Sequence, residues 1–298
     1  MRASRFKRLV YALAVAAPLA SATDPGIEVL HRERSLYRNI FVYEEDGLRC
    51  MAFTRTTMAR QSCVILAEPT KLVFNYARMM MAALYLNPAP QRILILGVGG
   101  GTLPSALQRL FPSASIDAVE IDPAVVRVAR RFFAFEPGRD TRVYEEDGRV
   151  FVKRMQRQGV MYNLIVLDAF DHEYIPEHML TREFLLEVKS LLADRGVLAA
   201  NTFSVSKLYD YESATYYSVF GDFFGLKKNN RVILWQSGGL PPKSDIVRNA
   251  DLLETKLAAL GVDKTWLLPQ IEIERGWPPA TRVLTDQFSP SNLLNGPH

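Results

Sequence analysis

The sequence has few of the residues that build metal centres or disulfide frameworks. Its 298 residues include four histidines and two cysteines, Cys50 and Cys63. No Cys/His group has the spacing of a zinc site, so we expect no bound metal. The cysteines allow one disulfide, but their spacing does not require it. His172 and His178 lie near a charged stretch and are interpreted as solvated loop residues.

Strong charge of one sign and internal repeats are also missing. The net charge is +4, and the basic residues are scattered except at the N-terminus. Because no basic stripe is interleaved with aromatic residues, we expect no nucleic-acid partner. The chain carries 48% hydrophobic and 23% charged residues, which is typical of a folded globular protein. No low-complexity linker divides it, so we expect one main domain preceded by a small extension.

Met1–Ala22 looks like a targeting segment. Four basic residues stand among the first eight, and the apolar stretch Leu9–Leu19 that follows is too short to span a bilayer comfortably. Ala20-Ser21-Ala22 has the small-x-small pattern of a cleavage site. We interpret residues 1–22 as a signal peptide or an uncleaved anchor, through which the protein would associate with a membrane.

The stretch Arg92–Pro123 predicts a unit that binds a nucleotide or nucleoside. The apolar run Ile93–Leu96 suits a strand that is buried on both faces, as in a parallel sheet. A glycine cluster follows at once, then a helical pattern over Leu103–Leu110 and a second apolar run over Ile116–Val119. The cluster consists of Gly97, Gly99, Gly100 and Gly101. Glycines let a loop turn sharply and let a ligand approach its backbone.

The second apolar run ends on Glu120, which bears on the kind of ligand. An acid at the end of the second strand, about twenty residues after the glycines, is placed to bind a ribose diol. A dinucleotide site would usually have a third glycine that packs the helix against the sheet, and Leu103–Ser105 contain none. An adenosine without a phosphate, such as S-adenosylmethionine or a derivative, therefore fits as well as NAD or better.

From Arg92 onward, predicted strands and helices alternate, which indicates an α/β fold. Further strands are predicted at Arg142–Tyr144, Leu164–Leu167, Gly196–Asn201 and Arg231–Gln236, and further helices at Ala124–Phe133, Arg149–Gln156, Thr181–Leu192, Ala214–Phe223 and Asp251–Leu260. We expect a Rossmann-like, doubly wound parallel sheet with helices on both faces, similar to that of S-adenosylmethionine-dependent methyltransferases.

A small β-rich extension precedes this domain. Strands are predicted at Asn39–Tyr43, Arg49–Thr54 and Arg60–Leu66, with an Asp-Gly hairpin signal between the first two. Apolar residues at helical spacing predict a connecting helix over Leu72–Tyr85. The expected organisation is a targeting segment over 1–22, the extension and its helix over 23–86, and the Rossmann-like catalytic domain over 87–298.

Three of the predicted strands lead into acids, namely Glu120, Asp147 and Asp168. In open α/β sheets the ligand binds outside the carboxyl ends of the strands, so we expect these acids to surround one site. Glu120 would bind ribose hydroxyls, and Asp147 with Gly148 would bind the adenine amino group. Asp168 and Asp171 would project into the reaction cleft, where a carboxylate pair can hold a cationic amine and accept its proton. The alternative for Asp171 is a solvated loop.

The stretch Glu28–Asn201 resembles the spermidine synthase (polyamine aminopropyltransferase) family. The motifs that carry the resemblance are VLHRERSLYRNIFVYEEDG, FNYARMM, ILILGVGGG, VEIDPAVV, EEDGRVF and YNLIVLDAFDHEYIPEHMLTREFL. With RQS and LTDQFSP, the segments LNPAPQRILILGVGGGTLP and IPEHMLTREF are most similar to the spermidine-synthase-like branch that is often fused to membrane transporters. As an ordered set the motifs are specific to the superfamily and less specific to the reaction.

The resemblance implies a complete nucleoside half of the site. The residues assigned to binding of the cosubstrate are Gly97, Gly99, Gly101, Glu120, Asp147 and Gly148. Glu120 matches the acid that binds the cosubstrate ribose. Asp147 and Gly148 match the adenine contacts.

The resemblance implies an altered amine half. Asp168 matches the proton-accepting aspartate, Asp171 the second aspartate of that loop, which contacts the amine, and Tyr76 a tyrosine that lines the amine site. Gln61 matches a glutamine near that site, although its spacing to Tyr76 is longer here.

Three positions depart from the family pattern. Gly100 stands where members that make spermidine usually have an aspartate, Ala77 where Gln or His is usual, and Arg38 where a glutamine is usual. Losing an acid and gaining a base both weaken a site for a polyamine.

The leading hypothesis is an aminopropyltransferase. An amine such as putrescine would attack decarboxylated S-adenosylmethionine, a cosubstrate, and no cofactor would be tightly bound. Two alternatives stay open: a methyltransferase that uses S-adenosylmethionine itself, and a non-catalytic nucleoside-binding homologue. The resemblance also implies a homodimer. Supply of the cosubstrate favours the cytoplasm and the N-terminal segment favours the periplasm or a membrane, so the localisation stays open.

Overall fold

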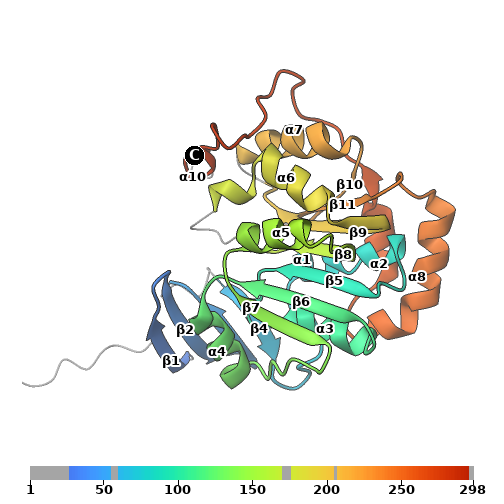
Figure 1. Ribbon diagram of the computed structural model, residues 1–298. Coiled ribbons are helices and arrows are strands. Elements are labelled where there is room, and N and C mark those ends of the chain that lie inside the picture. The colour runs from blue at the N-terminus through green and yellow to red at the C-terminus, as the bar shows by residue number, and fades with distance from the viewer. Residues whose placement is uncertain (1–26, 55–59, 170–175, 205–206, 295–298) are drawn as a thin grey trace, which may run out of the picture.

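The computed structural model describes residues 27–54, 60–169, 176–204 and 207–294 (Figure 1). The expected targeting segment Met1–Ala22 and the expected amine contact Asp171 lie outside these residues. Within them, no helix has both the length and the hydropathy that crossing a bilayer requires. The described strands form two sheets, one of four strands and one of eight. The boundaries expected between the extension and the main domain stay a prediction.

The larger sheet confirms the Rossmann-like prediction, with one difference. Its parallel half runs in the order β7 (Thr141–Glu145), β6 (Ser115–Glu120), β5 (Arg92–Leu96), β8 (Tyr162–Leu167) and β9 (Leu192–Thr202). Beyond β9 come β11 (Arg231–Gln236), β10 (Phe224–Lys227) and β12 (Glu272–Ile273), each antiparallel to its neighbour. The sheet is therefore mixed rather than wholly parallel. A turn of a few residues joins β10 to β11, and such a short connection can only link antiparallel strands.

Helices cover both faces of this sheet (Figure 1). The layer on one face includes α2 (Ala83–Leu86), α3 (Thr102–Leu110) and α8 (Lys243–Ala258), and that on the other α5 (Gly148–Arg157), α6 (Arg182–Lys189) and α7 (Leu208–Phe220). Ile93 and Ile95 of β5 pack into the first layer, and Leu94 and Leu96 into the second. Successive side chains of a strand point to opposite faces, so the unbroken apolar run is buried on both sides as predicted.

The smaller sheet packs against α4 (Pro123–Phe132) of the main domain (Figure 1). Its strands are β1 (Glu28–Arg34), β2 (Asn39–Glu45), β3 (Leu48–Ala52) and β4 (Arg60–Ile65), antiparallel in chain order. Asp46 and Gly47 have φ angles of 50° and 75°, as a type I′ turn requires, which confirms the predicted hairpin. The shared cluster consists of Ile40, Val42, Met51 and Val64 from the sheet and Ala124, Val125, Val128 and Phe133 from the α4 region.

The helix predicted over Leu72–Tyr85 is wrong as a single element. The structure has α1 (Asn75–Met80) and α2, separated by a tighter turn in which the amides of Met81, Ala82 and Leu84 bond three residues back. Every residue of 79–86 is buried. An uninterrupted buried run has no single apolar face, so its spacing could not locate the break.

Short elements complete the chain. These are η2 (Glu177–Met179), α9 (Lys264–Leu267), η3 (Leu268–Gln270) and α10 (Ser291–Leu294). Thr181 caps the start of α6, because its hydroxyl accepts the Phe184 amide at 3.2 Å.

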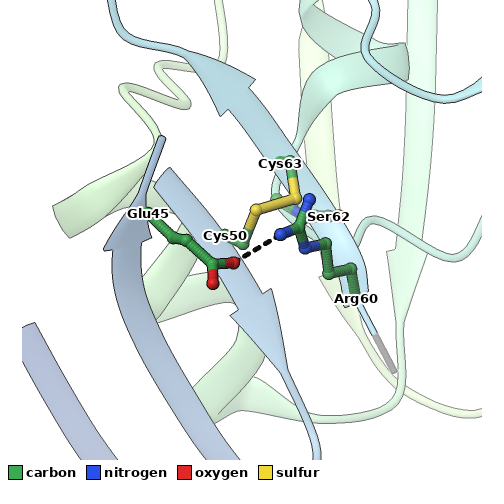
Figure 2. Close-up of a disulfide and its surroundings, with 6 residues drawn as sticks. Glu45, Cys50, Arg60, Ser62 and Cys63 are labelled. Atoms are coloured by element: carbon green, nitrogen blue, oxygen red, sulfur yellow. Dashed lines mark hydrogen bonds and ion pairs between the residues drawn. A yellow bond between two sulfur atoms is a disulfide. The ribbon is translucent and has the colours of Figure 1, made fainter. Parts of the chain in front are cut away.

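Cys50 and Cys63 form a disulfide between β3 and β4 (Figure 2). They face each other directly in the register of the two strands, and both side chains are buried. Glu45 and Arg60 form an ion pair beside the bond (Figure 2). The two cysteines are 13 residues apart in the sequence, so the disulfide closes a short loop. It therefore fixes the pairing of the two strands.

The double variant Cys50→Ala/Cys63→Ala should unfold at lower denaturant concentration than the oxidised protein. Closing a loop of this size lowers the entropy of the unfolded chain, which stabilises the fold by about 3 kcal/mol. Urea unfolding followed by circular dichroism measures the difference. A thiol reductant should destabilise the wild type and leave the double variant unchanged. Equal midpoints for the oxidised protein and the variant would contradict the expectation.

Candidate active site

The three acids predicted to surround one site lie at one edge of the larger sheet. Glu120 is the last residue of β6, Asp147 follows β7, and Asp168 follows β8. These strands and β5 are neighbours and run parallel. Their carboxyl ends therefore share an edge, and the glycine loop that follows β5 lies between them.

The glycine loop is shaped by two very close approaches. Gly97 has a φ of 98°, and a Cβ atom there would lie 2.1 Å from the carbonyl oxygen of Asp168. Gly101 begins α3 with a φ of 76°, and its Cβ would lie 2.3 Å from the ring of Phe135. No other residue fits at either position without moving its neighbours. The loop thus brings its own backbone against Asp168.

Glu120 binds the glycine loop from one side. Its Oε2 accepts the amides of Val98 at 3.1 Å and Gly99 at 3.4 Å, and its Oε1 accepts the amide of Asp122 at 3.1 Å. Burial raises the pKa of Glu120, and the amide hydrogen bonds and the positive charge of Arg38 act against that rise. Arg38 also lies over the Phe53 ring, 4.1 Å from its centre. The carboxylate thus lies at the loop where a ribose diol was expected.

Ser62 binds the same loop from the smaller sheet. Its hydroxyl accepts the amide of Gly100 at 2.8 Å, and its Oγ lies 2.7 Å from where a Gly99 Cβ would be. Gln61, the predicted amine-site glutamine, is the extra residue of a β-bulge in β4, opposite the step between Met51 and Ala52. Bulges turn side chains out of the regular alternation and often occur beside active sites. The role of Gln61 stays a prediction.

Asp168 is held by two polar side chains. The Asn201 amide donates to its Oδ1 at 3.0 Å, and the Tyr76 phenol donates to the same carboxyl group. The pKa of Asp168 is raised to about 7 in all. Burial is the main cause of the rise, the nearby charge of Glu120 adds to it slightly, and the two hydrogen bonds act against it. Burial and the Asp168 carboxylate also raise the pKa of Tyr76. A carboxyl group that is half protonated near neutral pH suits proton transfer.

Asp147 has a structural role in addition to its predicted one. Its Oδ1 caps α5 by accepting the amides of Arg149 at 2.9 Å and Val150 at 3.0 Å. Its Oδ2 lies 2.9 Å from Nε2 of His178. Gly148 lies against Leu96 at the end of β5, where its Cβ would be 3.5 Å from the leucine side chain. Asp147 and Gly148 are therefore next to the glycine loop.

Three residues at this edge were missed from the sequence: Ser62, His178 and Asn201. Asn201 could have been found, because it is a polar residue near the end of an apolar strand, as Asp168 is. His178 was interpreted as a solvated loop residue; it is exposed, and its ring also contacts Asp147, which the sequence did not indicate. Ser62 lies in the RQS motif, but that motif did not predict its contact with the glycine loop, which depends on how the two sheets pack.

Comparison with known proteins agrees with this geometry. Residues 73–219 match the model of the spermine/spermidine synthase domain. A polyamine aminopropyltransferase of Vibrio vulnificus is 46% identical over 272 residues, which span 89% of this chain and 91% of that protein.

Two solved structures are also similar. A probable spermidine synthase from Corynebacterium glutamicum superimposes with a TM-score of 0.63 at 17% identity, over 85% of this chain and 98% of that one. Human methyltransferase-like protein 13 in complex with SAH superimposes with a TM-score of 0.56 at 26% identity, over 70% of this chain and 97% of that one. By its similarity to the Vibrio protein over 89% of the chain and by its synthase domain, the chain belongs to the polyamine aminopropyltransferase (spermidine synthase) family.

Proposed function

We propose that the protein transfers an aminopropyl group from decarboxylated S-adenosylmethionine to an amine such as putrescine. The observation that carries this proposal is the half-buried Asp168 carboxyl group, held by Asn201 and Tyr76 beside the glycine loop. Membership of the family supports the same reaction. A homodimer, which the resemblance implies, is part of the proposal.

The nucleoside would bind across the glycine loop. Glu120 would accept the ribose hydroxyls, because its carboxylate lies directly beside the loop amides. Asp147 would accept the adenine amino group through Oδ2, the oxygen that faces His178. Gly148, which is packed against Met179 and Leu96, would contact the ring beside Asp147. These roles would place the sulfonium near Asp168, which adjoins Gly97.

Asp168 would act as the general base. It would take a proton from the ammonium group of the acceptor, and the freed lone pair would attack the carbon next to the sulfonium. A carbon–nitrogen bond forms as the carbon–sulfur bond breaks, and the electrons of that bond go to sulfur. Methylthioadenosine then leaves as a neutral thioether. Alignment of the two reactants would contribute much of the rate.

Asn201 would help to hold the acceptor. Its amide nitrogen is engaged with Asp168, while its buried Oδ1 has no hydrogen-bond partner among the residues that the structure describes. A buried acceptor without a partner is costly unless a ligand supplies a donor. An ammonium group at Asp168 would be such a donor.

Purified protein should release methylthioadenosine from decarboxylated S-adenosylmethionine when putrescine or a related diamine is present. Asp168→Asn should lower kcat by about 10²–10⁴-fold, because a positioned base contributes that much, while nucleoside binding persists. Asp222→Asn, at an exposed ion pair with Arg275, is the matched control. Lack of release with every amine in a panel would overturn the proposal, and tight nucleoside binding without turnover would indicate the non-catalytic alternative.

The pH profile should report the raised pKa of Asp168. Only the unprotonated carboxylate can accept a proton, so kcat/KM should fall as the pH drops through about 7. Asn201→Ala removes a hydrogen bond that lowers this pKa, so the fall should begin at higher pH in that variant. Initial rates between pH 5 and 9 would measure both. An unchanged acid limb in the variant would argue against Asp168 as the base.

A methyltransferase is the second candidate. Gly100 supplies no acid that would repel the carboxylate of S-adenosylmethionine, and Arg38 adds a positive charge that acts on Glu120. The 26% identity to human methyltransferase-like protein 13 also favours it.

Calorimetry with the two cosubstrates should distinguish the candidates. An aminopropyltransferase should bind decarboxylated S-adenosylmethionine more tightly than the carboxylated form, because only the former is its substrate. Arg38→Gln should increase that preference by removing a positive charge, whereas Arg127→Gln, at an exposed ion pair with Glu33, should not. Clear preference for the carboxylated form would instead support methyl transfer.

A further inference from the structure

A segment near the C-terminus, residues 284–292, lies against the proposed adenine-binding part of the site. We call it the C-terminal strap. It follows every strand of both sheets in the chain and leads into α10. Figure 1 shows α10 on the same side of the molecule as α6 and α7. The function proposed above gives the strap no role.

Asp286 of the strap forms a bidentate ion pair with Arg149. The two terminal guanidinium nitrogens of Arg149 donate to the two carboxylate oxygens at 2.7 and 2.8 Å. The same guanidinium donates to Glu187 of α6 at 2.8 and 2.9 Å, and to the carbonyl oxygen of His178 at 3.1 Å. Arg149 is buried, and its hydrogen bonds lower the pKa of Asp286. Paired guanidinium–carboxylate contacts fix geometry as well as charge.

The strap is also bound to the start of α6. The Thr181 hydroxyl donates to Asp286 Oδ1 at 2.7 Å, and the Arg182 amide donates to the carbonyl oxygen of Leu284 at 2.9 Å. In return, the Asp286 amide donates to Glu183 at 3.0 Å. Asp286 is thus fixed through its side chain and its backbone.

A third set of contacts reaches η2. The Ser289 hydroxyl donates to the carbonyl oxygen of Glu177 at 3.0 Å. The backbone and side-chain amides of Asn292 donate to the Glu177 carboxylate at 3.2 and 3.1 Å. The strap therefore binds two separate segments, through Arg149 on α5 and through Glu177 on η2.

These contacts converge on Asp147 and Gly148. Arg149 is the next residue along the chain, and His178, whose carbonyl it binds, contacts Asp147 through its ring. Met179 of η2 packs on Gly148, with its methyl carbon 2.9 Å from where a Cβ would be. The surface proposed to meet adenine is thus assembled from two separate segments, α5 and η2, and the strap binds both.

We propose that the C-terminal strap sets the position of the adenine-binding surface, with Asp286 as its positioning residue. This inference rests on the proposed function, because it assigns adenine to Asp147 and Gly148. A binding group is effective only when its neighbours hold it in the productive geometry. Loss of the strap contacts would let η2 and the start of α5 move apart, which weakens nucleoside binding while leaving Asp168 and the amine half in place.

Asp286→Asn tests the inference by replacing one charged partner with a group of the same shape. The dissociation constant for methylthioadenosine, by calorimetry, and the KM for decarboxylated S-adenosylmethionine should rise by about tenfold, as is usual when a residue that orients a ligand-binding group is lost. The KM for the amine and kcat should change less than about twofold, because Asp286 contacts neither reactant. Asp286→Glu, which keeps the charge, should restore part of the affinity. Asp222→Asn should bind as the wild type does.

A second variant covers the case in which Asp286→Asn does not fold. Ser289→Ala/Asn292→Ala removes the two side-chain hydrogen bonds to η2, keeps the one from the backbone amide of residue 292, and leaves the Arg149 ion pairs intact. Weaker nucleoside binding with normal circular dichroism is therefore expected. Unchanged binding in the folded variants would overturn the inference. Absence of methylthioadenosine binding in the wild type would overturn the proposed function instead, so the two failures are distinguishable.

Discussion

The backbone of Gly97 approaches the backbone of Asp168 more closely than any side chain would permit. This contact joins the end of β5 to the end of β8 and fixes the glycine loop beside the carboxyl group. The contact with the loop partly shields the half-buried Asp168 from water, and this desolvation raises the pKa of its carboxyl group to about 7. A change in the shape of the loop would therefore also change the pKa of Asp168.

The smaller sheet contributes residues to the candidate active site. Ser62 binds the glycine loop opposite Glu120, so the loop amides are satisfied from both sheets. The neighbouring disulfide ties β4 to β3 (Figure 2), and the apolar cluster with α4 holds the sheet against the main domain. Displacement of β4 would move a hydrogen-bond partner of the loop directly. The Arg38 charge reaches Glu120 from the same sheet.

Much of this arrangement could be predicted from local patterns. The apolar runs before Gly97, Glu120 and Asp168 identified parallel strands, and parallel strands bring their carboxyl ends together. Contacts between distant segments left no such pattern. Ser62 and Asp286 both lie in motifs that carry the family resemblance, but those motifs do not reveal their contacts, because each residue bonds a partner in another element, 38 and 137 residues away respectively. The mixed sheet was missed because strand direction depends on the connection that precedes each strand.

The order of the chain has a consequence for biosynthesis. A ribosome completes every strand of both sheets before it makes Asp286. The nascent protein can therefore build its core, its disulfide and its glycine loop while the surface assigned to adenine is still incomplete. Nucleoside binding would then be acquired only after Asp286 has been added, later than the two sheets.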